Sequence, residues 1–448
     1  MRPGGYPSTV RTLPTTYWLR GPLALLAAAS VVAVLRAPDE RTPWWGITQN
    51  LLDVHVYRWG AEAVRNGAPL YEDLLWGFNE RFYAPMPFTY PPFSALLFQP
   101  LPMVSRPLMA AGWTALSLAL LYLVVRMSFR ALDYSPDRVT RQVSLCIALI
   151  CLSLEPVRTT LWLGQINILL LALVLADHLA SRAGPGSRAV RWRRLAGIGS
   201  GLAAGIKLTP AFFWAHWVLT GRWRVAVVSV ITFLGTVALG FLVIPSDAVR
   251  YWSGTVFESS RIAEDSVVSN QSVSGVIARV LDVDAAPRAT WFILATLAGV
   301  LGLAVAALAH RAGHQLLGLT LAGMTMSMVS PFSWGHHWVW FVPLLILTVH
   351  HAISARRWYF WLPPLLLWAA TATWVQSFPN PDFPDNRWVA MGLFMLGGDI
   401  PPAIFMVFTN IYPLVWLVAT AASAVLVVRR RRARRRPGER IRPQTDDG

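Results

Sequence analysis

The sequence has little charge for its length. Of 448 residues, only 14% are Asp, Glu, Lys or Arg, whereas 55% are hydrophobic. A soluble domain carries about 25% charged residues. Apolar runs of near membrane-crossing length recur along the chain, and they are continuous rather than alternating. This pattern predicts an all-α polytopic membrane protein and disfavours a transmembrane β-barrel.

Cysteines and nucleotide motifs are also scarce. The two cysteines, Cys146 and Cys151, lie in one apolar run, which excludes a disulfide scaffold and a thiolate metal site. The chain has no P-loop and no dinucleotide-binding glycine motif after a strand. The adjacent His336 and His337 do not have the spacing of a helical metal pair. We therefore expect no metal, no cofactor and no nucleotide-driven step.

The charged residues are mostly basic, and they are unevenly distributed along the chain. The formal net charge is +16, and the arginines cluster in short segments between apolar runs and in the tail after Val428. This distribution is typical of the positive-inside rule rather than of nucleic-acid binding. We expect both termini to be cytoplasmic, no nucleic-acid partner, and a basic cytoplasmic tail, 429–448, next to lipid headgroups.

The apolar runs predict about 11–12 transmembrane or re-entrant segments in a single domain, 1–428. The first run is interpreted as a retained signal anchor. Residues 195–220 lie between two arginine-rich segments but are too short for two crossings, so they predict a broken-helix hairpin that turns near Lys207. The remaining predicted spans are 21–37, 107–125, 142–154, 162–180, 225–244, 288–309, 315–330, 338–354, 358–376 and 401–428.

This topology puts a polar set on the extracytoplasmic side, in segments that include the loop 38–90. The set is Asp53, Arg58, Tyr90, Glu155, Arg158, Asn270, Gln271, His336 and His337. Residues 53–67 predict an amphipathic interfacial helix, on which Asp53 and Tyr57 share a face and Arg58 and Glu62 form a solvated pair. Asp53 is a candidate for facing a cleft, with a helix N-cap as the alternative.

The other polar candidates each have two interpretations. Tyr90, stiffened by Pro91, packs under a lipid or sugar or simply opens a helix. Gln165 and Asn167 contact substrate or join helices. Lys207 needs a carboxylate or a substrate phosphate as its partner. Asn270 opens an N-Q-S glycosylation pattern or, with Gln271, contacts a ligand.

Six stretches together resemble glycosyltransferase family 87, the polytopic mannosyltransferases of mycobacteria and related actinobacteria. They are "LLDVHVYRWGAEAVRNGAPLYED", "FTYPPFSALLFQPL", "LGQINILLLALVLAD", "GLAAGIKLTPAFF", "NQSVSGVI" and "SPFSWGHHWVW", in that order between residues 51 and 340. The resemblance implies a GT-C fold, Asp53 as catalytic base, and a substrate contact for His336 or His337.

The resemblance also implies the reaction. A sugar passes from polyprenyl-phosphate-mannose to a lipid-linked acceptor on the extracytoplasmic face of the cell membrane. The acceptor is phosphatidylinositol mannoside, lipomannan or lipoarabinomannan, and the new bond is α-(1,2). A β-linked donor that gives an α-linked product is inverted, which needs one carboxylate base. The leaving phosphate needs cationic or hydrogen-bonding partners, for which Lys207, Arg158 and His336 are the candidates.

Two other functions remain open. Relatives use arabinosyl donors, so the donor class is better defined than the sugar. A transporter or flippase for a lipid-linked sugar would also suit the broken hairpin at Lys207. It would not need a carboxylate at the position of Asp53. Neither the acceptor nor the oligomeric state follows from the sequence.

Overall fold

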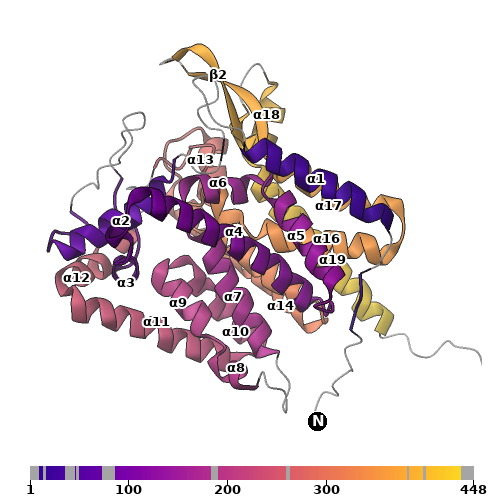
Figure 1. Ribbon diagram of the computed structural model, residues 1–448, viewed down its shortest axis with the longest axis horizontal. Helices are drawn as coiled ribbons and strands as arrows, with labels where there is room; N and C mark the ends of the chain where they lie inside the picture. The colour runs from indigo at the N-terminus through magenta and orange to yellow at the C-terminus, as the bar shows by residue number, and fades with distance from the viewer. Residues whose placement is uncertain are drawn as a thin grey trace, which may run out of the picture.

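The computed structural model describes residues 10–13, 17–35, 46, 50–72, 86–182, 190–258, 263–380, 383–396 and 400–434, and every structural statement below concerns these. Its longer helices form an elongated bundle (Figure 1). Helices α2 (Leu52–Arg65), α3 (Pro92–Leu97) and α12 (Pro245–Ser253) lie together at one end of the long helices α4 (Arg106–Ala131) and α11 (Trp223–Val243). This end carries the predicted helix with Asp53.

Four described helices are long and apolar enough to cross a membrane: α4, α11, α14 (Arg288–Arg311) and α19 (Ile411–Arg434). A fifth span is formed if the bent pair α6 (Glu155–Leu163) and α7 (Asn167–Ser181) counts as one. Shorter helices occupy the other predicted spans. They are α1 (Tyr17–Leu35), α5 (Arg138–Cys151), α15 (Gln315–Val329), α16 (Phe341–Ala355) and α17 (Leu362–Thr371). The prediction of an all-α polytopic membrane protein is confirmed.

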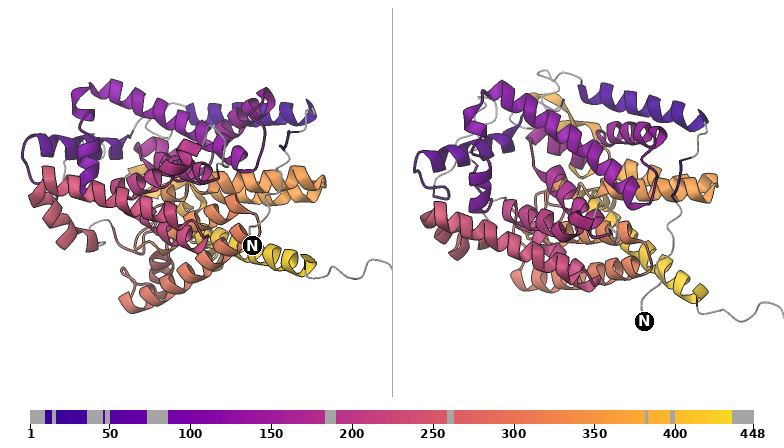
Figure 2. Two further views of the ribbon diagram at one scale, coloured as in Figure 1. Left: turned by 90° about the horizontal axis from the view of Figure 1, so that it is seen from below. Right: turned by 60° about the horizontal axis from the view of Figure 1, so that its bottom comes forward.

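The predicted hairpin at 195–220 is present. After α8 (Val190–Leu195), α9 (Ile198–Ile206) packs alongside α11, and both helices run in the same direction. Gly197, Gly201 and Gly205 meet α11 at successively later residues. The chain turns through Lys207 and η2 (Thr209–Phe212) and returns as α10 (Phe213–Leu219). Trp214 of α10 donates a hydrogen bond back to Ser229 near the start of α11. The two views of Figure 2 show these helices beside α11.

The three glycines of α9 explain why this hairpin packs closely. They recur every four residues and therefore share one helix face. A Cβ at Gly197 would lie 2.5 Å from the carbonyl oxygen of Val225, and at Gly201 and Gly205 it would collide with Ser229 and Thr236. Small residues at this spacing let membrane helices approach closely. Asp177 of α7 accepts hydrogen bonds from the backbone of Gly199 and Ser200, at 3.3 and 2.6 Å, and so caps α9.

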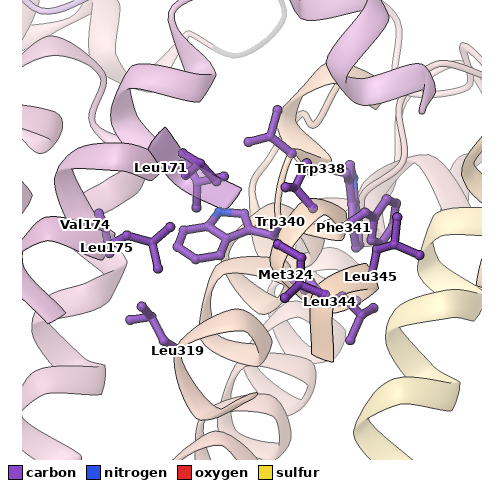
Figure 3. Packing of buried hydrophobic residues seen from close by; sticks show 14 of the residues in the cluster. Leu171, Val174, Leu175, Leu319, Met324, Trp338, Trp340, Phe341, Leu344 and Leu345 are labelled. Carbon is purple, nitrogen blue, oxygen red and sulfur yellow. The ribbon is translucent and has the colours of Figure 1, made fainter. Parts of the chain in front are cut away.

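The core lies where α7, α15 and α16 meet. Leu171, Val174 and Leu175 face Leu319, Met324 and Trp340, and all six are buried (Figure 3). Side chains that interdigitate in this way are close-packed and leave the surrounding helices little room to shift. This core holds α7 and the segment 335–340 in fixed relative positions, and both carry candidate site residues.

The structure differs from the predicted spans in three places. Between the predicted spans 358–376 and 401–428, β1 (Trp374–Asn380) and β2 (Phe383–Met391) form an antiparallel hairpin that no apolar run predicted. The segment that begins at Glu155 is helix α6 rather than a loop between spans. The last predicted span, 401–428, is broken at Asn410 into α18 (Pro402–Thr409) and α19. The other short elements are η1 (Leu101–Met103), η3 (Thr255–Phe257), α13 (Val273–Leu281), η5 (Gly335–Trp338), η6 (Trp358–Trp361) and η7 (Leu393–Met395).

Candidate active site

Asp53 lies in the first turn of α2, where its charge faces the positive end of the helix dipole. Its side chain does not cap the helix, so the N-cap alternative is wrong. Instead the Oδ1 atom of Asn50 accepts a 3.0 Å hydrogen bond from the backbone N–H of Leu52. Leu51 stands in the left-handed region, with φ of 47°, and turns the chain into the helix. Asp53 is therefore left free to face its neighbours in the site.

Gln165 holds the aromatic wall of the site together. The hydroxyl of Tyr57 donates to Gln165 Oε1 at 3.1 Å, and Gln165 Nε2 donates to the hydroxyl of Tyr90 at 3.2 Å. The two tyrosine hydroxyls are 3.2 Å apart. Gln165 also interacts with the Asp53 carboxyl and favours its ionised form. One amide thus bonds both tyrosines and lies against the candidate base.

A sharp bend brings Gln165 to α2. Helices α6 and α7 meet at 118°, and Gly164 at the bend has φ of 68°. A Cβ at Gly164 would lie 2.9 Å from Val54 Cγ1, so α2 packs directly on the bend. The backbone N–H of Leu51 also donates to the carbonyl of Trp162 at 2.8 Å. A glycine is required both by the positive φ and by this close approach.

Lys207 enters the site from the turn of the hairpin. Its Nζ atom donates to Asn167 Oδ1 at 3.3 Å and contacts His337 Nε2 at 2.9 Å. It lies 5.7 Å from the centre of the Tyr90 ring and interacts electrostatically with Asp53. A charged lysine only donates, so His337 Nε2 accepts and the imidazole proton is on Nδ1.

The segment with His336 and His337 meets the site at Asn167 and Lys207. Asn167 Nδ2 donates to the carbonyl of His336 at 3.0 Å, which fixes the backbone. The two imidazole rings are nearly perpendicular, at 86°, and therefore face different surroundings. His336 Nε2 is buried without a hydrogen-bond partner among the described residues. It is available to bond a substrate oxygen.

Burial sets the electrostatics of these groups. It raises the pKa of Asp53 to about 6, although the positive charge of Lys207 and the hydrogen bond from Gln165 both act to lower it. Burial, and then the charge of Lys207, hold the pKa of His336 and His337 below its ordinary value. Near neutral pH the site therefore holds an ionised Asp53 beside two neutral imidazoles.

A pocket adjoins the polar site and continues into the bundle along α7. Asn167 and His337 form part of its wall. Thr209, Ser327, Ser330 and Trp340 also line it, and the sequence analysis missed all four. Two serines at the end of an otherwise apolar run, in "SMVSPFS", were the available signal.

Three predicted contact residues lie elsewhere. Arg158 is 4% exposed, interacts electrostatically with Glu155 and donates to the carbonyl of Ala390 at 2.7 Å. Asn270 and Gln271 are fully buried. Their hydrogen bonds to protein groups disfavour both glycosylation at Asn270 and direct ligand contact by either amide.

Asn270 and Gln271 instead connect two segments. Asn270 Oδ1 accepts from the backbone N–H of Ser333 at 3.1 Å, just before the histidines. Gln271 donates to the carbonyl of Thr409 at 2.7 Å and accepts from the N–H of Tyr412 at 3.2 Å, across the break between α18 and α19. The two amides position the histidine segment and the start of α19.

Arg58 is not solvated as predicted. It does pair with Glu62 at 2.9 Å, but it also donates to the carbonyls of Leu101 and Val104 at 3.1 and 2.8 Å. These contacts tie α2 to the turn after α3. Among the described residues, no three His, Cys, Asp or Glu side chains are grouped to hold a metal ion. Of the two acids nearest Asp53 in sequence, Glu72 lies 3.7 Å from Arg250, and Asp73 lies outside the described residues.

The described helices thus hold a carboxyl, a lysine and neutral hydrogen-bonding groups together in a membrane bundle, an arrangement that fits a multi-pass membrane enzyme of the group-transfer type. Residues 88–331 match the model of glycosyltransferase family 87, which is more than half of the chain. The chain belongs to this family, and the predicted GT-C fold and glycosyltransferase class are confirmed. Asp53, His336 and His337 lie outside the matched range.

Three curated relatives agree with this family assignment. The chain is 33% identical over 337 residues to a polyprenol-phosphate-mannose-dependent alpha-(1-2)-phosphatidylinositol pentamannoside mannosyltransferase of Mycolicibacterium smegmatis, covering 74% of this chain and 78% of that protein. A Mycobacterium tuberculosis protein of the same description is 33% identical over 369 residues, 80% of this chain and 81% of its own. A phosphatidylinositol mannoside mannosyltransferase of M. smegmatis is 34% identical over 329 residues, 69% and 72%. No solved structure matches the chain.

Proposed function

We propose that the protein transfers mannose from polyprenyl-phosphate-mannose to a phosphatidylinositol mannoside and forms an α-(1,2) bond with inversion. The mycobacterial relatives named above carry this donor, this linkage and this class of acceptor in their descriptions. One structural observation carries the proposal furthest. A partly exposed carboxyl, Asp53, lies in one cluster with a lysine, whereas a transporter would not require that carboxyl.

Asp53 acts as the general base in this proposal. Its raised pKa brings it close to the operating pH, where a base is ionised and still basic enough to accept a proton. It removes the proton from the acceptor hydroxyl as that oxygen attacks the anomeric carbon. Gln165 directs the carboxylate, and a second carboxylate is not needed for a single inverting displacement.

Lys207 binds the leaving polyprenyl phosphate. Among the three candidates, it shares the site with Asp53, Asn167 and His337, whereas Arg158 is engaged with Glu155 and Ala390. A fixed cation stabilises the negative charge that develops on the phosphate as the glycosidic bond breaks. The buried Nε2 atom of His336 binds a sugar hydroxyl or a phosphate oxygen.

The end of the bundle with α2, α3 and α12 faces the extracytoplasmic side, and both termini are cytoplasmic. The arginine-rich segments between the spans support this orientation. The donor lipid then lies along the bundle with its phosphate near Lys207. The enzyme requires neither a nucleotide sugar nor a metal ion in this scheme.

The decisive experiment is transfer by purified Asp53→Asn protein from radiolabelled polyprenyl-phosphate-mannose to phosphatidylinositol mannosides. We expect a loss of at least about 100-fold in kcat, in the range of a removed general base. Glu62→Gln, on the same helix but in the pair with Arg58, is the matched control and should retain activity. Wild-type rates in Asp53→Asn would refute the assignment. Movement of labelled lipid across vesicles without transfer would favour a flippase.

A further inference from the structure

A second cluster of polar side chains is buried about three turns of α7 away from Asn167, at the opposite end of that helix from the candidate active site. It comprises His178 of α7, His216 and Trp217 of α10, His310 of α14, and Arg222 at the start of α11. His178, His216 and Trp217 are fully buried, and His310 is 9% exposed. The proposed reaction uses none of these residues.

These side chains are in mutual contact. The rings of His178 and Trp217 stack with centres 6.4 Å apart, and those of His216 and Trp217 are 5.2 Å apart. His216 and His310 are 6.0 Å apart. The guanidinium of Arg222 lies 5.8 Å from the centre of the Trp217 ring. Three helices and one helix start therefore contribute to a single polar cluster inside an apolar bundle.

The hydrogen-bonding roles of two ring nitrogens, as donor or acceptor, follow from their partners and their chemical structure. Arg222 Nη1 lies 3.1 Å from His178 Nδ1, and an arginine only donates hydrogen bonds. His178 Nδ1 must accept, so its ring proton is on Nε2. The indole nitrogen of Trp217 is also a donor only. Neither His178 Nε2 nor Trp217 Nε1 has a hydrogen-bond partner within the part of the chain that the structure describes.

More polar atoms lie unpaired beside these two donors. Both ring nitrogens of His216 and Nδ1 of His310 are buried without partners among the described residues. A buried donor without a partner loses its hydrogen bond to water and gains none in return, so native proteins rarely leave several together. Groups of this kind mark the place of a bound water or ion.

The local charge selects an anion. Arg222 donates to Gln315 Oε1 at 2.8 Å, and no carboxylate pairs with it among the described residues. Arg182 also acts electrostatically on His178 and His310, and its own partner, Asp133, lies 2.7 Å away. The charge of Arg182 is largely balanced by Asp133, so Arg222 is the cation that, beside unpaired N–H donors, attracts a negative charge and repels a metal cation.

We propose that this cluster, His178, His216, Trp217, Arg222 and His310, binds one small inorganic anion, such as chloride or phosphate. His178 Nε2–H and Trp217 Nε1–H donate to the anion, and His216 and His310 add donors when their protons face it. Because His178, His216 and Trp217 are fully buried, a lipid headgroup cannot reach the donors without opening the bundle. The anion would hold α7, α10, α11 and α14 together at this end of the bundle.

The test is the thermal unfolding midpoint of the purified full-length protein at constant ionic strength, with gluconate replaced stepwise by chloride or by inorganic phosphate. A ligand that binds only the folded state raises the midpoint in a saturable way. We expect saturable stabilisation by chloride, phosphate or both. The same midpoint in all three salts would show that only water occupies the cluster and would overturn the proposal.

Two matched tryptophan variants locate the site. Trp217→Phe keeps the ring but removes the indole N–H, and it should weaken the apparent anion affinity at least about tenfold, as loss of one charge-assisted bond implies. Trp214→Phe, one turn earlier on α10, removes an N–H that donates to Ser229 at 2.8 Å and should leave the affinity unchanged. Equal affinities in both variants would also overturn the proposal. If Trp217→Phe does not fold, the wild-type series alone decides.

Discussion

Lowering the pH from 7.5 to 5 should reduce the kcat/KM for mannosyl transfer about tenfold, if Asp53 is the base. The base acts only when ionised. With a pKa of about 6, its ionised fraction falls from nearly all to about one tenth over this interval. An ordinary aspartate, with a pKa near 3.8, would stay more than about nine-tenths ionised at pH 5 and would leave the rate almost unchanged.

Removal of the lysine charge tests the cause of this pKa. The positive charge of Lys207 favours the ionised form of Asp53, so Lys207→Met should raise the pKa further. The acid limb of the pH profile should then move to higher pH, in addition to any loss of phosphate binding. If Lys207 acts on the phosphate alone, kcat/KM would fall at every pH and the limb would stay in place.

The assay is transfer of labelled mannose to phosphatidylinositol mannosides at subsaturating acceptor, between pH 4.5 and 8.5, with enzyme returned to pH 7.5 afterwards to exclude inactivation. Asp53→Glu is a useful companion, because it keeps a carboxylate but displaces it by one methylene. A wild-type acid limb near pH 4, or none in the range, would refute the argument that burial near Gln165 and Lys207 tunes the base.

Two further predictions concern packing around the site. Gly60→Ala should lower the free energy of unfolding by about 1–3 kcal/mol, because the new Cβ would lie 2.7 Å from Phe88 Cδ2 in a filled core. The unfolding midpoint checks this, and a neutral result would mean that Phe88 moves freely. Arg279→Ala should cost more than about 2 kcal/mol, because it leaves the carbonyls of Val267 and Asn270 and the amide oxygen of Asn410 without their buried donor. A midpoint equal to that of the control Arg311→Ala would contradict it.

Much of the fold followed from composition and arginine placement. Apolar runs gave the helices, and the short interval between two basic segments gave the hairpin that turns at Lys207. The break at Asn410 was not visible, because "PPAIFMVFTNIYPLVWLV" is apolar throughout. The break depends on Gln271 and Arg279, which are distant in sequence and bond Thr409 and Asn410. Such tertiary compensation cannot be inferred from local pattern.

The candidate site was predicted in part. Tyr57, Tyr90, Gln165, Asn167, Lys207, His336 and His337 all lie in the group around Asp53. The predicted topology grouped Asn270 and Arg158 with them, because it assigns each residue only to one side of the membrane. It does not specify how deeply a side chain is buried or which way it points. The structure places those two among structural hydrogen bonds. The catalytic roles of Asp53 and of the residues grouped around it stay predictions.

The glycine-lined helix α9 sets a limit on changes of chain length. It is nine residues long, and three glycines fix its register against α11 before the chain reaches Lys207. One inserted residue would rotate everything beyond it by about 100° and advance it by about 1.5 Å. Insertions or deletions inside α9 should therefore abolish transfer more reliably than most single substitutions, so the spacing from Gly197 to Lys207 acts as a fixed molecular length.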